Sequence, residues 1–530
     1  MAATIFATRQ GQYPATHSFR LSAFPFPTGY ARDLSSMPVP EPDRLTLRQA
    51  TAAAALLAAA SPPLANELGE LFAAAGHELA LVGGPVRDVF LGRRSGDIDL
   101  TTDAPPDRIQ DIVRDWADQV WTVGIEFGTV GLRKGRSTFE ITTYRSESYD
   151  RTSRKPVVSF GRSLEDDLAR RDFTVNAMAA RLPGHQLVDP FSGVADLQRK
   201  VLRTPGAPEQ SFTDDPLRIL RAARFTAQLD FTVTPPVREA MRDLAGLLAP
   251  PKVSAERIEG ELTKLLLAPV PGGPAAGIRL LVETGVADQV LPEIPRLQLE
   301  TDEHHRHKDV YEHSLTVLTQ AIELEGRYGL EPDIVLRLAA LLHDIGKPRT
   351  RSLLPDGRVA FHHHELVGAN QAGRRLSQLR YSKDVVADVS RLIELHLRFH
   401  GYSDGEWTDS AVRRYVTDAG PLLKRLHALT RADSTTRNKA KALRLARAYD
   451  DLEARIDELA AREELASMRP DLDGHEIMAI LRIPPGRMVG RAYDYLRELR
   501  IEHGPLGREA ATAELLRWAA AEGLEIPPDA

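Results

Sequence analysis

The chain has 530 residues, 42% of them hydrophobic, and its 74 Asp and Glu slightly outnumber its 68 Lys and Arg. Because it contains no cysteine, a disulfide framework, a thiolate zinc site, an iron–sulfur cluster and a cysteine nucleophile are all excluded. The length suits about three or four domains, and no apolar run reaches the roughly 18 residues of a membrane helix. We therefore expect a multidomain, cytoplasmic protein with no membrane partner.

The start of the chain and its charge distribution are both uneven. Residues 1–44 are rich in Pro, Ser and Arg and show no helical or strand period, so we expect a disordered extension, or a translation start at Met37. Residues 131–225 hold 17 Lys and Arg against 12 Asp and Glu, within an otherwise acidic chain. A local excess of positive charge suits an anionic ligand bound in one place.

The hydrophobic pattern predicts a small α/β head over residues 45–200. Expected strands cover 79–82, 98–100, 129–132 and 137–144, and expected helices cover 85–91 and 107–116, with a hairpin turn at Lys134-Gly135. Beyond about residue 200 only the helical period remains. We expect an all-α body there, divided into segments 201–300, 301–450 and 451–530.

Two glycines mark the turn between the first expected strand and its helix. Gly83 and Gly84 precede Pro85, which takes the first helical position that proline favours. Glycines let a ligand approach the backbone closely, and free N–H groups at a helix start bind phosphate. The guanidinium of Arg87 would add several N–H donors to the same phosphate. A Gly-Gly pair is also common in ordinary turns, so the prediction depends on the residues that follow.

Three carboxylates are expected on neighbouring strands. Asp97 and Asp99 flank Ile98, and because alternate residues of a strand share a face, the two aspartates project together. A bare Asp-x-Asp also occurs at polar strand edges. Glu140, on the polar face of the segment 137–144, supplies a third carboxylate. This combination favours Mg²⁺ ions that assist phosphoryl or nucleotidyl transfer.

The order of these motifs resembles the polymerase-β-type nucleotidyltransferases. It is most similar to the class II tRNA CCA-adding enzymes and the related bacterial poly(A) polymerases, over about residues 75–450. The resemblance implies that Asp97, Asp99 and Glu140 are catalytic, with Asp97 and Asp99 holding Mg²⁺. It also implies a nucleotide-binding set composed of Gly83, Gly84, Arg87, Arg170, Arg171, Asp172, Asn176, Asp215, Arg218 and Arg221.

The arginine motif follows an expected helix start. Ser163 with Asp166 three residues later is typical of a capping box, so we expect Arg170, Arg171 and Asn176 on one helix and its continuation. A solvated charged face would also explain the two arginines. The resembled enzymes have a flexible loop in this region, which implies a mobile segment over Ser146–Gly161.

A second motif opens the helical neck at residues 201–300. Asp215 and Arg218 lie three residues apart around Pro216, where a helix is expected to begin. They could form a simple surface ion pair. Alternatively, the carboxylate would accept from the exocyclic amine of cytosine or adenine while the guanidinium donates to the ring. Arg221 would extend the network, and Asp214 stands where the family usually has Glu.

The body contains a second set of potential ligands: His313, His343, Asp344, His364, His396 and Asp433. Imidazole and carboxylate together suit a divalent transition metal or Mg²⁺ that activates water. The set resembles that of the HD phosphohydrolase domain, which we therefore expect over residues 301–450. The resemblance implies phosphatase or 2′,3′-cyclic phosphodiesterase activity, or else a vestigial tRNA-binding module.

By this resemblance, the protein adds C, C and A to the 3′ end of tRNA from CTP and ATP, without a template and with release of pyrophosphate. One alternative is a poly(A) polymerase, or an enzyme that adds only A or only CC. An alternative of another class is an HD phosphohydrolase whose inert head binds RNA. The oligomeric state does not follow from the sequence.

Overall fold

The computed structural model describes residues 47–60, 63–93, 98–148, 157–160, 163–249, 252–298, 309–355, 359–401, 407–435, 438–463 and 469–524. The expected extension over residues 1–44 lies outside these ranges, as do Asp97 and positions 149–156 of the expected mobile segment. The chain forms two compact units that meet in the sequence between Ala207 and Pro208. Within the described ranges, no helix combines the length and apolar character needed to cross a bilayer.

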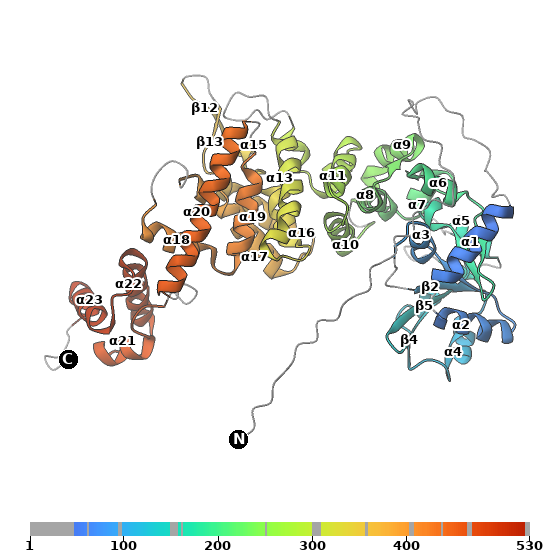
Figure 1. Ribbon diagram of the computed structural model, residues 1–530, viewed down its shortest axis with the longest axis horizontal. Helices are drawn as coiled ribbons and strands as arrows, with labels where there is room; N and C mark the ends of the chain where they lie inside the picture. The colour runs from blue at the N-terminus through green and yellow to red at the C-terminus, as the bar shows by residue number, and fades with distance from the viewer. Residues whose placement is uncertain are drawn as a thin grey trace. The chain divides into compact units, whose positions relative to one another are not determined.

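The first unit is built around a mixed seven-stranded sheet with the strand order β3-β4-β5-β2-β1-β8-β9. Figure 1 labels β2, β4 and β5 of this sheet. Its strands are β1 (Leu79–Val82), β2 (Ile98–Thr102), β3 (Gln119–Trp121), β4 (Thr129–Lys134), β5 (Ser137–Thr143), β8 (Ala179–Leu182) and β9 (Gln186–Val188). The four strands expected from alternation are therefore present, and the expected turn joins β4 to β5, where Lys134 pairs with Ser137.

The register of the central strands fixes which residues share an edge. β1 and β2 are antiparallel with Leu81 opposite Leu100, so the end of β1 and the start of β2 lie at the same edge of the sheet. β2 and β5 are parallel, and Asp99 pairs with Glu140. Parallel neighbours need a long crossover, which here is supplied by the chain through α4 (Pro106–Val113), β3 and β4.

Helices cover both faces of this sheet. α2 (Pro63–Ala74) packs against β1 and β8, and α4 (Pro106–Val113) packs against β4 and β5. α3 (Gly84–Phe90) follows β1 directly. Leu164 and Leu168 of α5 (Leu164–Ala169) join a buried cluster with Ala80 and Val82. Apolar residues alternate with the polar ones along β5, so Glu140 is exposed while its two neighbours are buried.

The second unit is mainly helical, as expected. Its helices are α7 (Pro208–Asp214), α8 (Leu217–Leu229), α9 (Pro235–Leu244), α10 (Ala255–Leu266), α11 (Gly273–Glu283), α12 (Ala287–Val290), α13 (Val310–Leu324), α14 (Ile334–Leu342), α15 (Lys347–Thr350), α16 (His364–Gln378), α17 (Lys383–Leu395), α18 (Asp409–Ala419), α19 (Leu423–Asp433) and α20 (Lys439–Glu463). A small core joins the last three helices, α21 (Gly474–Leu481), α22 (Arg487–His503) and α23 (Arg508–Ala521).

The expectation that strands disappear beyond residue 200 is wrong in detail. β12 (Arg351–Leu353) and β13 (Val359–Phe361) form an antiparallel pair within the second unit. Each strand has only three residues, too few to produce a clear alternation. The sequence Pro355-Asp356-Gly357 between them is a typical turn signal, and it could have identified the pair.

Candidate functional site

The glycine turn after β1 has the conformation that its sequence predicts. Gly83 caps α3 with a φ of 71°, in the left-handed region that favours glycine. Pro85 lies in the first turn of the helix. A Cβ at position 83 would lie 3.1 Å from Nη1 of Arg171. The turn therefore brings backbone N–H groups and a guanidinium together, which is an arrangement suited to an anion.

A buried carboxylate orients both arginines of the Arg170-Arg171 motif. Asp167 is fully buried, and its Oδ1 accepts from Arg170 at 2.6 Å while its Oδ2 accepts from Arg171 at 3.0 Å. Burial raises the pKa of Asp167, but Arg171 and Arg170 outweigh that effect and hold it below its usual value. The sequence analysis missed Asp167, although its spacing of three and four residues from the arginines was a usable signal.

The arginine motif is not one continuous helix, which corrects the expectation. α5 ends at Ala169, Arg170 is its C-cap, and Asn176 lies in a separate 3₁₀ turn over Thr174–Asn176. The break between α5 and the 3₁₀ turn places the Asn176 side chain against two polar partners. Its Oδ1 accepts from Arg87 at 2.7 Å, and its Nδ2 donates to Asp172 at 3.0 Å. The expected helix start is confirmed, since the Ser163 side chain accepts from the Asp166 N–H.

Two of the three expected carboxylates lie side by side. Asp99 and Glu140 are paired residues of adjacent parallel strands, at the edge of the sheet where β1 ends. Asp99 is half-buried and Glu140 is exposed. Asp97 lies outside the described residues. Carboxylate oxygens are the donors that Mg²⁺ prefers, so the chemistry of Asp99 and Glu140 fits such a cation.

In the second unit, Asp215 lies just before α8 and pairs with an arginine that the sequence analysis did not select. Arg257, on α10, donates to both Asp215 oxygens at 3.1 and 3.2 Å. Arg218 is buried and donates to Ser211 Oγ at 2.8 Å. Asp214 accepts from Gln210. Forty-two residues separate Asp215 from Arg257, so local spacing could not have indicated this pair.

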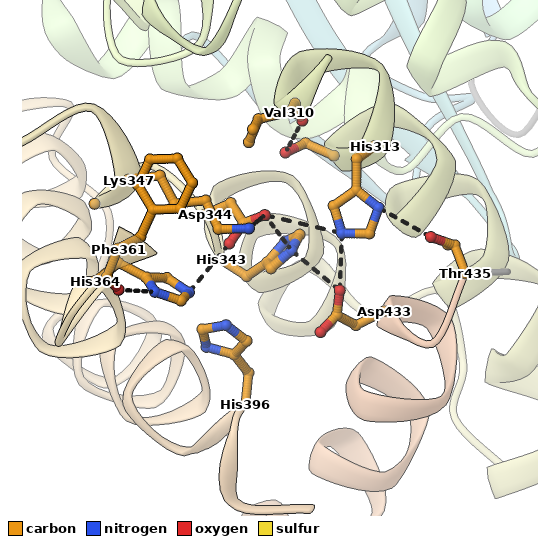
Figure 2. A network of polar contacts seen from close by, with 12 residues as sticks. Val310, His313, His343, Asp344, Lys347, Phe361, His364, His396, Asp433 and Thr435 are labelled. Carbon is orange, nitrogen blue, oxygen red and sulfur yellow. Dashed lines mark hydrogen bonds and ion pairs between the residues drawn. The ribbon is translucent and has the colours of Figure 1, made fainter. Parts of the chain in front are cut away.

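The six candidate ligands of the helical body converge on one buried centre (Figure 2). His313 comes from α13, His343 and Asp344 follow α14, His364 opens α16, His396 caps α17, and Asp433 ends α19. Four of the six are almost completely buried, at 0 to 4% exposure: His343, Asp344, His364 and His396.

The hydrogen bonds of the rings fix how they face the centre. The Nδ1 atoms of His343, His364 and His396 lie 2.9, 2.9 and 2.6 Å from the carbonyl oxygens of Ala340, Phe361 and Ile393. A carbonyl only accepts, so each Nδ1 carries the proton and each Nε2 points inward. The Nε2 atoms of His343 and His364 are buried without a hydrogen-bond partner. Orphaned nitrogens of this kind fit a metal ion.

A close approach of two segments builds one side of this cluster. Gly346 follows Asp344, and a Cβ on it would lie 2.1 Å from the carbonyl oxygen of His364. Only glycine allows the chain after α14 to run this close to α16. The approach brings His364 Nε2 to 3.3 Å from Asp344 Oδ1.

The charges of the cluster call for a cation. Burial raises the pKa values of Asp344 and Asp433. His343 and Lys347 outweigh this effect at Asp344, and His313 and His343 outweigh it at Asp433, so both pKa values lie well below the usual range. Burial and the charge of His343 lower the pKa of His396 to about 3. Burial would also lower the pKa of His343, yet Asp344 and Asp433 raise it to about 10. The carboxylates of Asp344 and Asp433 thus favour a positive charge, either a proton on His343 or a metal ion, at this centre.

Comparison with protein families gives three matches along the chain. Residues 79–203 match the poly A polymerase head domain, and residues 310–438 match the HD domain. Residues 230–297 match a family described as "Probable RNA and SrmB- binding site of polymerase A". The matches follow the order of the sheet unit, the neck helices and the histidine cluster.

Curated relatives give further similarity. An A-adding tRNA nucleotidyltransferase of Deinococcus radiodurans is 36% identical over 451 residues, which are 83% of this chain and 95% of the relative. A CCA-adding enzyme of Streptococcus pyogenes is 47% identical over 196 residues, 37% of this chain and 47% of the relative. The chain thus spans about half the length of that relative.

Two CCA-adding enzymes are among the solved structures with similar folds. The Bacillus stearothermophilus enzyme in complex with CTP aligns with a TM-score of 0.63 and 25% identity, covering 87% of this chain and 99% of that one. The Thermotoga maritima enzyme complexed with tRNA_CCA aligns with a TM-score of 0.57 and 18% identity, covering 88% and 98%.

Proposed function

The chain belongs to the family of class II tRNA nucleotidyltransferases and poly(A) polymerases, and on this basis we propose that it adds C, C and A to the 3′ end of tRNA from CTP and ATP, with release of pyrophosphate. The observation that carries the proposal is the common edge of the sheet, where the glycine turn after β1 lies beside the start of β2 and where Asp99 pairs with Glu140.

The triphosphate of the incoming nucleotide would bind at the glycine turn. The backbone N–H of Gly84, at the start of α3, would donate to a phosphate oxygen. Arg171 lies close to Gly83 and its Nε is buried without a hydrogen-bond partner, so it retains donor capacity. Arg87 and Arg170 would add two further positive charges to the phosphate site, and Asp167 holds Arg170 and Arg171 in position. Asn176 and Asp172 would orient Arg87.

The carboxylates Asp97, Asp99 and Glu140 would act on the reacting groups. Divalent cations, most suitably Mg²⁺, would be held by Asp97 and Asp99 and supply charge stabilisation at the α-phosphate and the leaving pyrophosphate. Glu140, exposed beside Asp99, would orient the tRNA 3′-hydroxyl for in-line attack. Positioning and electrostatics carry most of the rate enhancement in such transfers.

The neck would choose the base. Asp215 would accept from the exocyclic amine that cytosine and adenine share, and Arg218 would donate to the ring, while guanine and uracil present an acceptor where Asp215 needs a donor. Arg257 would hold the Asp215 carboxylate in the orientation that this requires. Arg221 follows on the same helix, α8, and would extend the base-reading face.

The test is incubation of the full chain with tRNA that lacks its 3′ CCA, supplied with CTP and ATP separately and together. Ordered addition of C, C and A followed by a stop supports the proposal, whereas a long A tail would indicate a poly(A) polymerase. Asp97→Ala should abolish incorporation. No incorporation by the wild type would overturn the proposal.

One specific observation favours a narrower activity as the second candidate. The relative that this chain covers over 95% of its length is named an A-adding tRNA nucleotidyltransferase. Under that alternative, the enzyme would extend tRNA ending in CC with ATP and would leave tRNA lacking all three nucleotides unchanged even with CTP present. The same assay therefore separates the two activities.

A hydrolytic activity is a further candidate for the histidine and aspartate cluster. A divalent cation bound there would supply an activated water for attack on a phosphoester. The orphaned Nε2 atoms of His343 and His364 support this assignment. Ring opening of 2′,3′-cyclic nucleotides to nucleoside monophosphates, lost in Asp344→Asn and kept in Asp99→Asn, is the expected result.

A further inference from the structure

An indole lies in the same row of the sheet as the two carboxylates of the head. Asp99 of β2 pairs with Glu140 of β5. Glu140 also pairs with Gly131 of β4, which in turn pairs with Trp121 of β3. Directly paired residues of neighbouring strands project to the same face, and neighbouring strands lie about 4.8 Å apart. Trp121 therefore belongs to the face that carries Asp99 and Glu140, three strands along the sheet from Asp99.

The ring of Trp121 lies over Gly131. A Cβ at position 131 would be 2.1 Å from Nε1 of Trp121 and 2.2 Å from its Cε2. Only glycine at this position lets the ring extend from β3 across β4, toward the strand of Glu140. Trp121 is half-buried and Glu140 is exposed. Among the described residues, no aromatic ring packs on this indole and no group accepts a hydrogen bond from it.

The indole and the proposed triphosphate site lie on opposite sides of Asp99. In the strand order, β1 and its glycine turn flank β2 on one side, while β5, β4 and β3 follow on the other. In phosphoryl and nucleotidyl transfer the attacking and leaving oxygens are roughly in line. Because the pyrophosphate would leave on the side of β1, the attacking 3′-hydroxyl would approach from the side of β5, where Glu140 and Trp121 lie.

We propose that the 3′-terminal base of the acceptor tRNA stacks on Trp121, which positions its ribose hydroxyl beside Glu140. This inference rests on the proposed nucleotidyl transfer and adds the residue that holds the second substrate. Every base has an aromatic face, so a stacking platform accepts each of them. An acceptor that is extended by C, C and A presents a different last base at successive steps, and stacking tolerates this change.

Arg133 supplies a positive charge next to this platform. It follows Gly131 by two positions on β4 and so projects to the same face, and it pairs with Gln119 of β3 and Thr138 of β5. Its side chain is exposed. Cationic side chains in such positions bind nucleic-acid phosphates without regard to sequence. Arg133 would therefore hold the phosphate of the terminal nucleotide while its base lies on Trp121.

The test uses the full chain and a tRNA whose 3′-terminal nucleotide carries 2-aminopurine, a base that loses fluorescence when it stacks. We expect quenching on binding to the wild type and to Trp121→Phe, and none with Trp121→Leu. The KM for this tRNA should rise about tenfold in Trp121→Leu, while the KM for nucleotides stays unchanged. Trp116→Leu is the matched control, because that indole contacts Phe139 on the other face of the sheet and its loss should leave the quenching intact.

Two further variants separate the platform from its surroundings. Gly131→Ala keeps the indole but displaces it by the new Cβ, so the quenching should be lost. This variant, compared with Trp121→Phe, decides the matter if Trp121→Leu fails to fold by circular dichroism. Arg133→Ala should keep the quenching, weaken tRNA binding and reduce the salt dependence of the affinity by about one phosphate contact.

The outcomes distinguish this inference from the proposed function. A wild type that incorporates nucleotides, with equal quenching by Trp121→Leu, would overturn the inference and leave the function standing. A variant that keeps the quenching but loses stability would also overturn it, because the indole would then only cover Gly131. No incorporation by the wild type overturns the proposed function and the inference with it.

Discussion

Arg257 places its guanidinium against both oxygens of Asp215, although Arg257 lies on α10 and Asp215 lies in the link between α7 and α8. A carboxylate that is gripped from one side presents its remaining lone pairs in a fixed direction. The pair is partly exposed, with 27% of the Asp215 side chain accessible, so a base can still reach it. Arg257 thus affects base choice without having to touch the nucleotide.

Arg257→Ala should therefore reduce base selectivity more than it slows transfer. We expect the preference for CTP and ATP over UTP to fall about tenfold, since a well-oriented pair contributes roughly 1 to 3 kcal/mol to discrimination. Single-turnover rates with each nucleotide measure this. Arg238→Ala, which removes the exposed pair with Glu283 on a neighbouring neck helix, is the matched control. Equal selectivity in both variants would contradict the role of Arg257.

Asp99→Asn and Glu140→Gln should differ in severity. Asp99 is proposed to hold a cation, so its loss should lower the incorporation rate by at least about a thousandfold. Glu140 is exposed and proposed only to orient the hydroxyl, which suggests a loss of about ten- to a hundredfold. Rapid-quench measurements at saturating nucleotide compare the two. A Glu140→Gln enzyme as inactive as Asp99→Asn would mean that Glu140 is itself a principal ligand.

Asp167→Asn should raise the KM for nucleotides with little effect on kcat. Its carboxylate carries the charge that pairs with Arg170 and Arg171, and an amide can accept from only one of them. We expect a KM increase of about tenfold for CTP and ATP alike, because both share the triphosphate. Steady-state kinetics decide this, and a change confined to one nucleotide would contradict it.

Gly346→Ala should damage the helical body and spare the head. The new Cβ would meet the His364 carbonyl at 2.1 Å, and overpacking of this kind costs about 1 to 3 kcal/mol. Cobalt binding to the cluster that contains Asp344 and His364 should fall with it, while CTP incorporation persists. Gly326→Ala is the control, because a Cβ there meets nothing within 4 Å. Urea denaturation and metal analysis of both variants give the comparison.

His427 should make the helical unit sensitive to mild acid. Burial lowers its pKa to about 4, more than nearby Glu453 raises it. Between about pH 6.5 and 4 the unfolded chain binds a proton that the native one does not, so stability falls as the pH drops through this window, by about 3 kcal/mol. His427→Phe keeps the stack on Tyr415 and should flatten the dependence.

The measurement for this last prediction is the urea midpoint at intervals from pH 4 to 7.5. His475→Phe, at an exposed position of α21, controls for the loss of a histidine as such. If both variants follow the wild-type curve, His427 is not the group responsible.

Short-range pattern was enough for much of this architecture. Alternation identified the strands around Asp99 and Glu140, and their parallel pairing brought the two carboxylates together as expected. Residues whose role depends on a partner far along the chain could not be identified from the sequence pattern. Arg257 is selected only by its contact with Asp215, and Thr435 only by its contact with His313. The break between Arg170 and Asn176 likewise reflects the bond to Arg87 on another helix.

The placement of the histidines has a consequence for how this body tolerates insertions. His343 and His396 are the C-caps of α14 and α17, and the Nδ1 atom of each ring donates to the carbonyl three residues back. One extra residue inside either helix would rotate its terminal ring by about 100° around the helix axis. Length variation among descendants of this sequence should therefore concentrate in the connecting loops, while α14 and α17 keep a constant number of residues.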